Sequence, residues 1–328
     1  MKLSEIGQIV AGGTPKTKIE EYWNGDVPWI TPKDLSSHAG MYISRGERNI
    51  SQVGLDNSSA KLLPKGTVLF TSRAPIGYVA IARNEVTTNQ GFKSIIVDDE
   101  NDNIFIYYLL KNNIDIIENH ANGSTFKEIS GSVMKSLEFG IPSLREQKAI
   151  AHILSTLDDK IEVNNQINKT LENMAQAIFK QWFVDFEFPN EEGEPYKSSG
   201  GEMVESELGM IPKGWEVGKL DDIATIVMGQ SPKGTSYNEV GEGEVFYQGR
   251  TDFSSRFPIR RLFTTEPKRM ANDGDVLMSV RAPVGDLNVA NERCCIGRGL
   301  SAISSSADLS SYILYVMHDL RKRLNVYN

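Results

Sequence analysis

Few residues of this 328-residue chain stand in patterns that support catalysis or metal binding. The Gly-Gly-Thr-Pro sequence at 12–15 lacks the Gly-Lys-Ser/Thr ending of a phosphate-binding loop, so it predicts a plain turn. Cys294 and Cys295 are adjacent, without the spacing of zinc ligands, and His152 has no Cys or carboxylate arrangement that implies a site. The sequence also contains no Asn/Asp-Pro-Pro-Tyr/Phe methyltransferase motif, no glycine-rich S-adenosylmethionine loop and no nuclease cluster. It therefore predicts a chain with no catalytic residues and no bound cofactor or metal of its own.

Composition and charge are those of a globular protein of about two domains. Two cysteines cannot form a disulfide framework, and no apolar run reaches the roughly 18 residues that span a bilayer, so we expect a reduced, cytoplasmic protein. The net charge of −8 is concentrated in residues 143–209, at −7, whereas residues 1–142 carry −2 and residues 210–328 carry +1. A basic face on either outer segment is therefore allowed, and the global charge neither proves nor excludes a nucleic-acid partner.

The chain repeats itself, which is the strongest signal of its organisation. Residues 2–15, KLSEIGQIVAGGTP, align without a gap with residues 219–232, KLDDIATIVMGQSP, at an offset of 217. Residues 63–77, LPKGTVLFTSRAPIG, align with residues 271–285, ANDGDVLMSVRAPVG, at an offset of 208. A unit of about 200 residues indicates a duplicated domain.

Beyond these blocks the two repeats share less. Gln90-Gly91 aligns with Arg298-Gly299 at the offset of 208, while residues 16–62 and 233–270 diverge. The pattern predicts one scaffold that carries two different variable surfaces.

Each repeat predicts a mixed α and β domain. Buried strands are expected at 66–70 and 274–278, each entered through a Gly turn, and at 94–97. Helices are expected at 104–110 and 309–320.

Residues 143–183 predict one long helix. A Ser143-Leu-Arg-Glu146 capping box opens it, and an apolar stripe at a spacing of three to four follows, interrupted by asparagines. About 40 helical residues are about 60 Å long, so the stripe needs a partner helix, as in a coiled coil; the alternative is an ordinary core helix. The candidate subunit contacts on this stripe are Ile150, Ile153, Leu157, Ile161, Leu171, Ile178 and Trp182, and the stripe also includes Ile167 and Met174.

The fold predicted from these features is α+β, with two similar mixed α/β domains joined by a long coiled-coil helix. The domains occupy residues 1–142 and 210–328, and the spacer helix occupies residues 143–186. Residues 187–209, rich in Gly, Pro, Ser and Glu, predict a solvated acidic linker.

Four short motifs support a more specific interpretation. They are Gly123-Ser-Thr-Phe126, Ile141-Pro-Ser-Leu-Arg-Glu-Gln147, Leu154-Ser-Thr-Leu-Asp-Asp-Lys-Ile161 and Ile211-Pro-Lys-Gly-Trp215. Each is weak alone. In this order, and with the duplication, they make nearly the whole chain resemble the specificity (S) subunit of type I restriction-modification systems.

The resemblance implies a non-catalytic subunit of the prokaryotic cytoplasm with no membrane contact. Two target-recognition domains would each recognise one half of a split site in double-stranded DNA, and long helices would hold them apart at a fixed spacing. The helix region would contact two methyltransferase (M) subunits and, in the full complex, restriction (R) subunits would join. S-adenosylmethionine, ATP and Mg would be bound by those partners.

The second repeat departs from the family pattern. After an expected helix at 309–324 the chain stops at Asn328, without a counterpart of residues 123–126 and without a second long helix. We therefore expect the helix stripe to lack an intramolecular partner. Three interpretations stay open: self-association through the 143–186 helix, a truncated or silent product that does not assemble, and a specificity subunit of a related multi-subunit restriction system.

Basic and amide side chains outside the helix are the candidate DNA contacts, since phosphate contacts position a protein and base-edge contacts supply sequence recognition. The Arg fork matches the two acceptors of guanine, and Asn89 or Gln90 suits adenine. Arg260-Arg261 lies in a divergent segment, where specificity is expected; the alternative for each candidate is a solvated surface charge. The candidates are Lys16, Lys18, Lys33, Arg45, Arg48, Arg73 and Gln90 in the first domain, and Lys233, Arg250, Arg256, Arg260, Arg261, Lys268 and Arg281 in the second.

Three residues, Arg73, Arg281 and Trp29, have competing interpretations. Arg73 and Arg281 belong to the shared Arg-Ala-Pro-x-Gly turn, and a residue present in both domains cannot explain two targets, so it either contacts phosphate or holds the turn. Trp29, which aligns near Tyr247, either stacks on a base or, as we expect, anchors the core.

Overall fold

The computed structural model describes residues 1–123 and 127–324, so Ser124 to Phe126 of the Gly-Ser-Thr-Phe motif lie outside the described residues. The chain forms two compact units, Met1–Lys169 and Thr170–Asn328. The division falls inside the long helix, rather than at its ends as the sequence pattern suggested. No helix in the described part of the chain combines the length and the hydropathy needed to cross a membrane.

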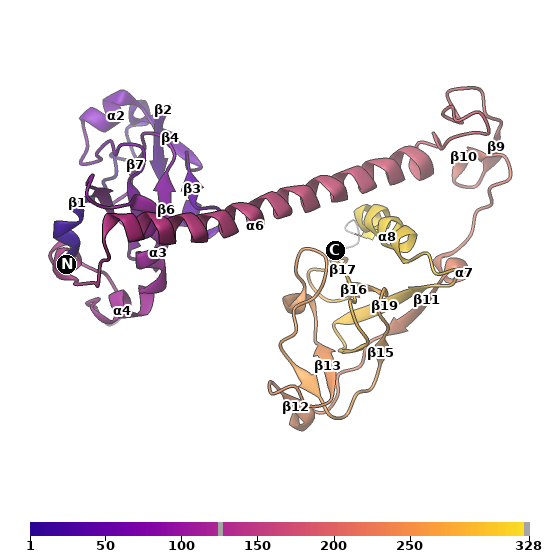
Figure 1. Ribbon diagram of the computed structural model, residues 1–328. Coiled ribbons are helices and arrows are strands. Elements are labelled where there is room, and N and C mark those ends of the chain that lie inside the picture. Colours follow the sequence, from indigo (N-terminus) through magenta and orange to yellow (C-terminus); the bar gives the residue numbers. More distant parts are fainter. Residues whose placement is uncertain (124–126, 325–328) are drawn as a thin grey trace. The chain divides into compact units, whose positions relative to one another are not determined.

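The first unit is built on a mixed five-stranded sheet in the order β1-β8-β5-β6-β3 and a three-stranded sheet in the order β4-β2-β7 (Figure 1). The strands are β1 (Gly7–Ala11), β2 (Trp23–Ile30), β3 (Tyr42–Ile43), β4 (Arg48–Ile50), β5 (Val68–Ser72), β6 (Ile76–Ala82), β7 (Thr87–Thr88) and β8 (Lys93–Val97). The short helices are η1 (Leu3–Glu5), η2 (Glu20–Tyr22), α1 (Pro32–Ser36), α2 (Gln52–Asp56), α3 (Asn103–Asn112), α4 (Ile114–Asn119) and α5 (Gly131–Ser136).

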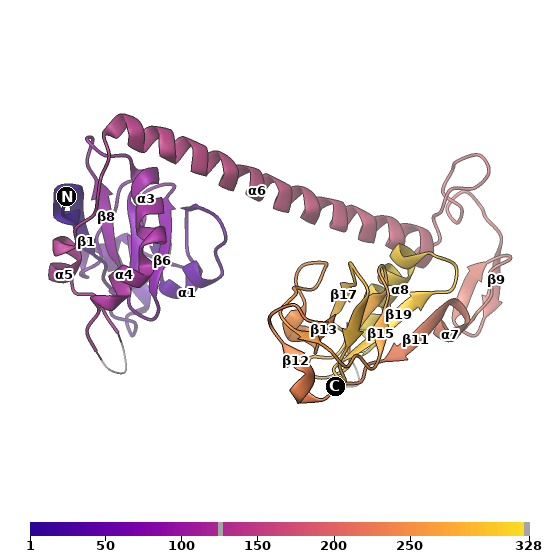
Figure 2. The same cartoon turned by 60° about the horizontal axis from the view of Figure 1, so that its bottom comes forward.

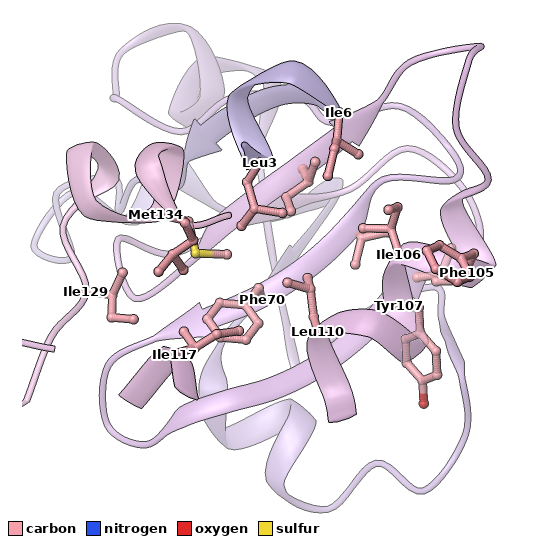
Figure 3. Packing of buried hydrophobic residues seen from close by; sticks show 14 of the residues in the cluster. Leu3, Ile6, Phe70, Phe105, Ile106, Tyr107, Leu110, Ile117, Ile129 and Met134 are labelled. Carbon is pink, nitrogen blue, oxygen red and sulfur yellow. The ribbon is translucent and has the colours of Figure 1, made fainter. Parts of the chain in front are cut away.

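The main core of this unit lies between the five-stranded sheet and the helices α3, α4 and α5. Phe70 of β5 is fully buried and meets Ile106 and Leu110 of α3 in one cluster with Leu3 and Met134 (Figure 3). The helix α3 starts where Asp102 accepts the backbone N–H of Phe105 at 2.9 Å, as an N-cap residue does. The predicted strands at 66–70 and 94–97 and the helix at 104–110 are confirmed.

The second unit has a four-stranded sheet in the order β11-β19-β16-β17, a five-stranded sheet in the order β12-β14-β13-β18-β15 and a β9–β10 hairpin. Helix α8 packs on the four-stranded sheet (Figure 2), with Ile313 and Met317 against Val276 and Ile303. The strands are β9 (Met203–Ser206), β10 (Gly209–Pro212), β11 (Ala224–Met228), β12 (Tyr237–Asn238), β13 (Glu244–Tyr247), β14 (Phe263–Thr264), β15 (Met270–Ala271), β16 (Val276–Ser279), β17 (Leu287–Val289), β18 (Cys294–Ile296) and β19 (Leu300–Ser305). The helices are η3 (Lys180–Val184), α7 (Leu220–Ile223), η4 (Gly234–Ser236), η5 (Arg250–Asp252) and α8 (Ser310–Leu324).

The internal repeat is a structural repeat at the level of strand register. The order β11-β19-β16-β17 matches β1-β8-β5-β6. Gly7 pairs with Val97 in the first unit, and Ala224 pairs with Ser305 in the second, which are the same positions after the offsets of 217 and 208. Both units also contain a parallel pair, β2 with β7 and β13 with β18. The two offsets found in the sequence therefore describe one duplicated scaffold.

The long helix α6 (Leu144–Phe179) starts at the predicted capping box and continues into a π-helical turn, η3. The Ser143 backbone N–H and hydroxyl both donate to Glu146 Oε2, at 3.0 and 2.7 Å. Every residue from 159 to 171 is exposed. The apolar stripe is exposed too, from 37% at Trp182 to 62% at Ile153. The prediction of one long helix is confirmed, and its stripe is exposed in the part of the chain that the structure describes.

The first turns of α6 dock on the first unit through a different face. Gln147, 2% exposed, accepts the backbone N–H of Asp102 at 2.9 Å and donates to Asn101 Oδ1 and to the Pro142 carbonyl, both at 3.0 Å. About three turns further along the helix, the Tyr108 hydroxyl donates to Asp158 at 2.8 Å. These bonds orient the helix by its polar side and leave the apolar stripe outward.

The last turns of α6 belong to the second unit. Glu172 accepts hydrogen bonds from Arg256 at 3.0 Å and from the Tyr315 hydroxyl at 3.2 Å. Phe179 and the following Phe183 pack against Tyr312 of α8, with ring centroids 5.9 and 5.1 Å apart. The stripe residue Ile178 remains 45% exposed beside them.

The segment at 187–209, predicted as a solvated linker, is instead folded. Phe188 stacks between Tyr196 and Trp215, at centroid distances of 4.6 and 5.5 Å, and β9 and β10 form an antiparallel hairpin. The Tyr196 hydroxyl donates to the Glu202 carbonyl at 2.9 Å. The acidic composition hid this aromatic stack, because its three rings are spread over 28 positions of the sequence.

Replacing Gln147 with Ala removes all three hydrogen bonds and leaves the Asp102 N–H without its side-chain acceptor. We expect the free energy of unfolding of the first unit to fall by about 1–3 kcal/mol in chemical denaturation. Lys148→Ala changes the exposed neighbour and serves as the control, with an expected effect within about 0.5 kcal/mol. Equal effects of the two substitutions would show that the Gln147 bonds do not anchor the helix.

Candidate nucleic-acid interface

Two loops meet at the same place in each unit, where backbone hydrogen bonds join the first loop to the end of the strand that leads into the second. The glycine loop, residues 12–15 and 229–232, follows β1 and β11; the crossing loop, residues 89–91 and 297–299, follows β7 and β18. Next to the crossing loop, Gly13 N–H donates to the Thr88 carbonyl at 2.8 Å, and Gln230 N–H donates to the Ile296 carbonyl at 3.0 Å. The two bonds are equivalent after the offsets of 217 and 208.

Close backbone contact explains the shared glycine of the glycine loop. A Cβ atom on Gly12 would lie 2.0 Å from the Asn89 carbonyl oxygen, and one on Gly229 would lie 2.2 Å from the Gly297 carbonyl oxygen. Real Cβ atoms do not approach a backbone oxygen so closely, so only glycine fits. The Gly-Gly-Thr-Pro sequence is thus part of a loop junction.

A third element, the proline turn at residues 73–77 and 281–285, is fixed to the crossing loop in both units. Ser72 N–H donates to the Gly91 carbonyl at 2.7 Å, and Val280 N–H donates to the Gly299 carbonyl at 2.9 Å. The Ala-Pro peptide bond of each turn is cis. Arg73 and Arg281 therefore stand at one repeated position beside the two loops.

In the second unit these elements surround a polar, cationic pocket. Arg281 and Arg298 are both exposed and have no carboxylate partner among the described residues, and Lys233 follows the glycine loop directly. No acidic side chain of the described residues lines the pocket. Its lining consists of Ser231, Pro232, Tyr237, Gln248, Arg281, Arg298 and Gly299.

The first unit presents the same loops with different side chains. Gln90 takes the place of Arg298, and its Oε1 accepts a hydrogen bond from the Thr14 hydroxyl. Arg73 contacts Glu128 at 3.4 Å, and Lys93 approaches the same carboxylate at 3.7 Å. The two units thus share the backbone arrangement of the glycine loop, the crossing loop and the proline turn, which we call the loop frame. They differ in the charge of the side chains that stand on it.

Among the other candidate DNA contacts of the first unit, some side chains interact with a neighbouring side chain and others do not. Lys33 is bound to Glu47 at 2.8 Å, and the Arg48 guanidinium lies 3.8 Å from the centroid of the Trp23 ring. Exposed side chains without an ion pair among the described residues are Lys16, Lys18 and Arg45. Trp29 is 6% exposed and donates to the Gly13 carbonyl at 3.0 Å, so its predicted role as a core anchor is confirmed.

A family model and known relatives agree with this duplicated domain organisation. The model described as "Type I restriction modification DNA specificity domain" matches residues 1–173 and 212–328. The chain belongs to this family. The type I restriction enzyme MjaIX specificity subunit of Methanocaldococcus jannaschii is 48% identical over 234 residues, which cover 70% of this chain and 52% of that protein. The putative MjaX specificity subunit of the same organism is 34% identical over 275 residues, covering 79% and 62%. The chain thus spans about half to three fifths of these relatives.

A solved structure supports the fold. The type I restriction-modification S subunit from M. genitalium superposes with a TM-score of 0.57 at 18% identity, covering 99% of this chain and 79% of that one. At this identity the likeness concerns the fold alone. It agrees with two mixed α/β domains joined by a long helix.

The arginines of the divergent segment of the second specificity domain are held in ion pairs. Arg260 binds Glu292 through two hydrogen bonds, at 2.5 and 2.7 Å, and Arg261 binds the buried Asp252. Their bonded nitrogens hold these guanidiniums against their own domain. Arg250 is likewise paired with Asp286, and Arg256 with Glu172. Lys233, Lys268 and Arg281 have no ion pair within the described residues.

Arg261 has a positioning role in the loop that leads to the pocket. The second carboxylate oxygen of Asp252 accepts the backbone N–H groups of Gln248 and Gly249, at 2.7 and 3.3 Å. Arg261 neutralises this buried carboxylate and so holds Gln248 at the pocket wall.

Arg298 and Gln248 were missed as candidates by sequence reasoning. The signal for Arg298 was present, because the repeat alignment places it opposite Gln90. The cysteine pair, in contrast, is buried in β18, and burial raises the pKa of the Cys294 thiol to about 12, which keeps it protonated.

We expect Arg261→Ala to destabilise the second domain by about 1–2 kcal/mol, since it leaves the buried Asp252 carboxylate without its cation. Arg293→Ala removes an exposed pair with Glu244, at 3.2 Å, and should cost less than about 0.5 kcal/mol. Chemical denaturation of the two variants measures the difference. A loss of DNA binding by Arg261→Ala at unchanged stability would contradict the positioning role.

Proposed function

We propose that the chain is a non-catalytic DNA-recognition subunit of a type I restriction-modification complex. Each specificity domain recognises one half of a split site in double-stranded DNA. The helix α6 docks M subunits, which bind S-adenosylmethionine and methylate adenine, and R subunits with ATP and Mg join through this assembly.

The observation that carries this proposal is that the loop frame is the same in both units, whereas the side chains on it differ. Equivalent backbone bonds fix the glycine loop, the crossing loop and the proline turn in both units. The exposed side chains on this frame differ, with Gln90 in one unit and Arg298 in the other. The two surfaces therefore have the same backbone but different exposed side chains. This suits two different half-sites, because contacts with base edges specify the DNA sequence.

The exposed stripe of α6 supports the docking role. Leu157, Ile161 and Leu171 are 55–58% exposed on a helix that nothing in the described chain covers between residues 159 and 171. An unsupported helical stretch gains little stability from its own hydrogen bonds in water, so a covering partner stabilises it. Self-association through the same stripe is the second candidate, because apolar residues at this spacing also suit a coiled coil of two copies.

Co-purification with the M subunit encoded at the same locus, followed by mapping of methylated adenines, tests the proposal. We expect a complex that methylates a two-part site with a fixed gap. A palindromic two-part site would indicate that two copies pair through α6. A folded chain that forms no complex would contradict the proposal and favour a silent product.

Leu157→Asp places a charge in the middle of the exposed stripe and should abolish co-purification with the M subunit, while leaving both domains folded. Asn173→Asp is the control, because it introduces the same charge at an exposed position that lies about 160° round the helix from Leu157 and about 100° or more from every stripe residue. Light scattering of the two variants at high concentration measures self-association in parallel. M binding retained by Leu157→Asp would exclude the stripe as the docking surface.

A further inference from the structure

Residues 90 and 298 occupy one repeated position of the loop frame. The crossing loop that carries them is fixed on both sides by equivalent bonds. Asn89 N–H donates to the Ile30 carbonyl at 3.0 Å, and Gly297 N–H donates to the Tyr247 carbonyl at 2.8 Å. On the other side, the residues that follow, Phe92 and Leu300, donate back into the loop at 3.3 and 2.9 Å. The backbone of Gln90 and that of Arg298 are therefore held alike.

Both side chains are exposed, and the neighbouring glycine loop bonds to the side chain of Gln90 and to the backbone of Arg298. In the first unit the Thr14 hydroxyl donates to Gln90 Oε1, which turns the amide into a fixed donor and acceptor pair. In the second unit the Ser231 hydroxyl, at the equivalent position, accepts the backbone N–H of Arg298 at 3.2 Å. The Arg298 guanidinium itself has no hydrogen bond among the described residues, so its N–H groups are available to donate to a ligand.

A cation that is constant between the units stands beside this variable position. A Cβ atom on Gly91 would lie 3.7 Å from Arg73 Cγ, and Arg281 lines the same pocket as Arg298. The constant cation suits a phosphate, which is present at every step of DNA. The variable side chains suit different bases, since a Gln amide matches adenine N6 and N7, and an Arg fork matches guanine O6 and N7.

We infer that position 90/298 is the specificity-determining position of this frame. Gln90 contacts an adenine in the half-site of the first domain, and Arg298 contacts a guanine in the half-site of the second. Arg73 and Arg281 hold the neighbouring phosphate. This inference rests on the proposed function, because it assumes that each domain recognises a half-site.

Exchanging the two side chains tests the inference. The full chain, in complex with the M subunit, selects DNA from a pool randomised over both half-sites, and the bound sequences are counted. Gln90→Arg should shift the preference at one base pair of one half-site from A·T to G·C by about tenfold or more, with the other half-site unchanged. Arg298→Gln should give the reverse shift in the other half-site, and Gln90→Ala should lose the preference at that one base pair alone.

Two control variants carry the same charge changes at the opposite ends of the strands. Asn84→Arg precedes β7, and Arg293→Gln directly precedes β18. Neither should alter base preference. An unchanged site for Gln90→Arg and Gln90→Ala, or an equal loss of preference at every position of the half-site, would overturn the inference while the two-part site of the unsubstituted chain upholds the proposed function. Selection of no two-part site by the unsubstituted chain would overturn both.

Discussion

The backbone hydrogen bonds that join the glycine loop to Thr88 and Ile296, the strand ends beside the crossing loop, are the constraint on which the candidate recognition surfaces depend. They require glycine at residues 12 and 229, because any Cβ there would collide with a carbonyl oxygen. Once the loops are joined, the proline turn is fixed to them through Gly91 and Gly299. The frame is therefore rigid in both domains, and the exposed positions on it are free to change. This separation lets one scaffold present different chemistry without a change of fold.

The long helix obeys a different constraint. Polar contacts orient its two ends, through Gln147 in the first unit and Glu172 in the second, and these contacts turn the apolar stripe outward. A row of half-exposed Leu and Ile side chains, even one interrupted by asparagines, leaves apolar surface in water, and such exposure is typical of an interaction surface. The sequence motif that begins the helix and the contacts that anchor it therefore act together to leave the stripe exposed.

Local patterns in the sequence predicted the duplicated scaffold, the capped helix at Ser143 and the buried Trp29, because each depends on short-range spacing or on burial. The ion pairs of Arg260 and Arg261 were beyond such patterns. Their carboxylate partners, Glu292 and Asp252, lie 32 and 9 residues away in the sequence, and only the folded domain brings them together. The aromatic stack around Phe188 escaped prediction for the same reason.

If the domains recognise DNA and the helix sets their spacing, a change of helix length should alter the gap between the half-sites and leave the half-site sequences unchanged. Insertion of seven helical residues between 159 and 171 keeps the stripe in register and lengthens the helix by about 10 Å, roughly three base-pair steps of DNA. The measurement is the map of methylated adenines produced by the complex with this longer chain. Unchanged half-sites separated by a gap about three base pairs longer are the predicted result. An unchanged gap, or an altered half-site sequence, would contradict the division of roles between domains and helix.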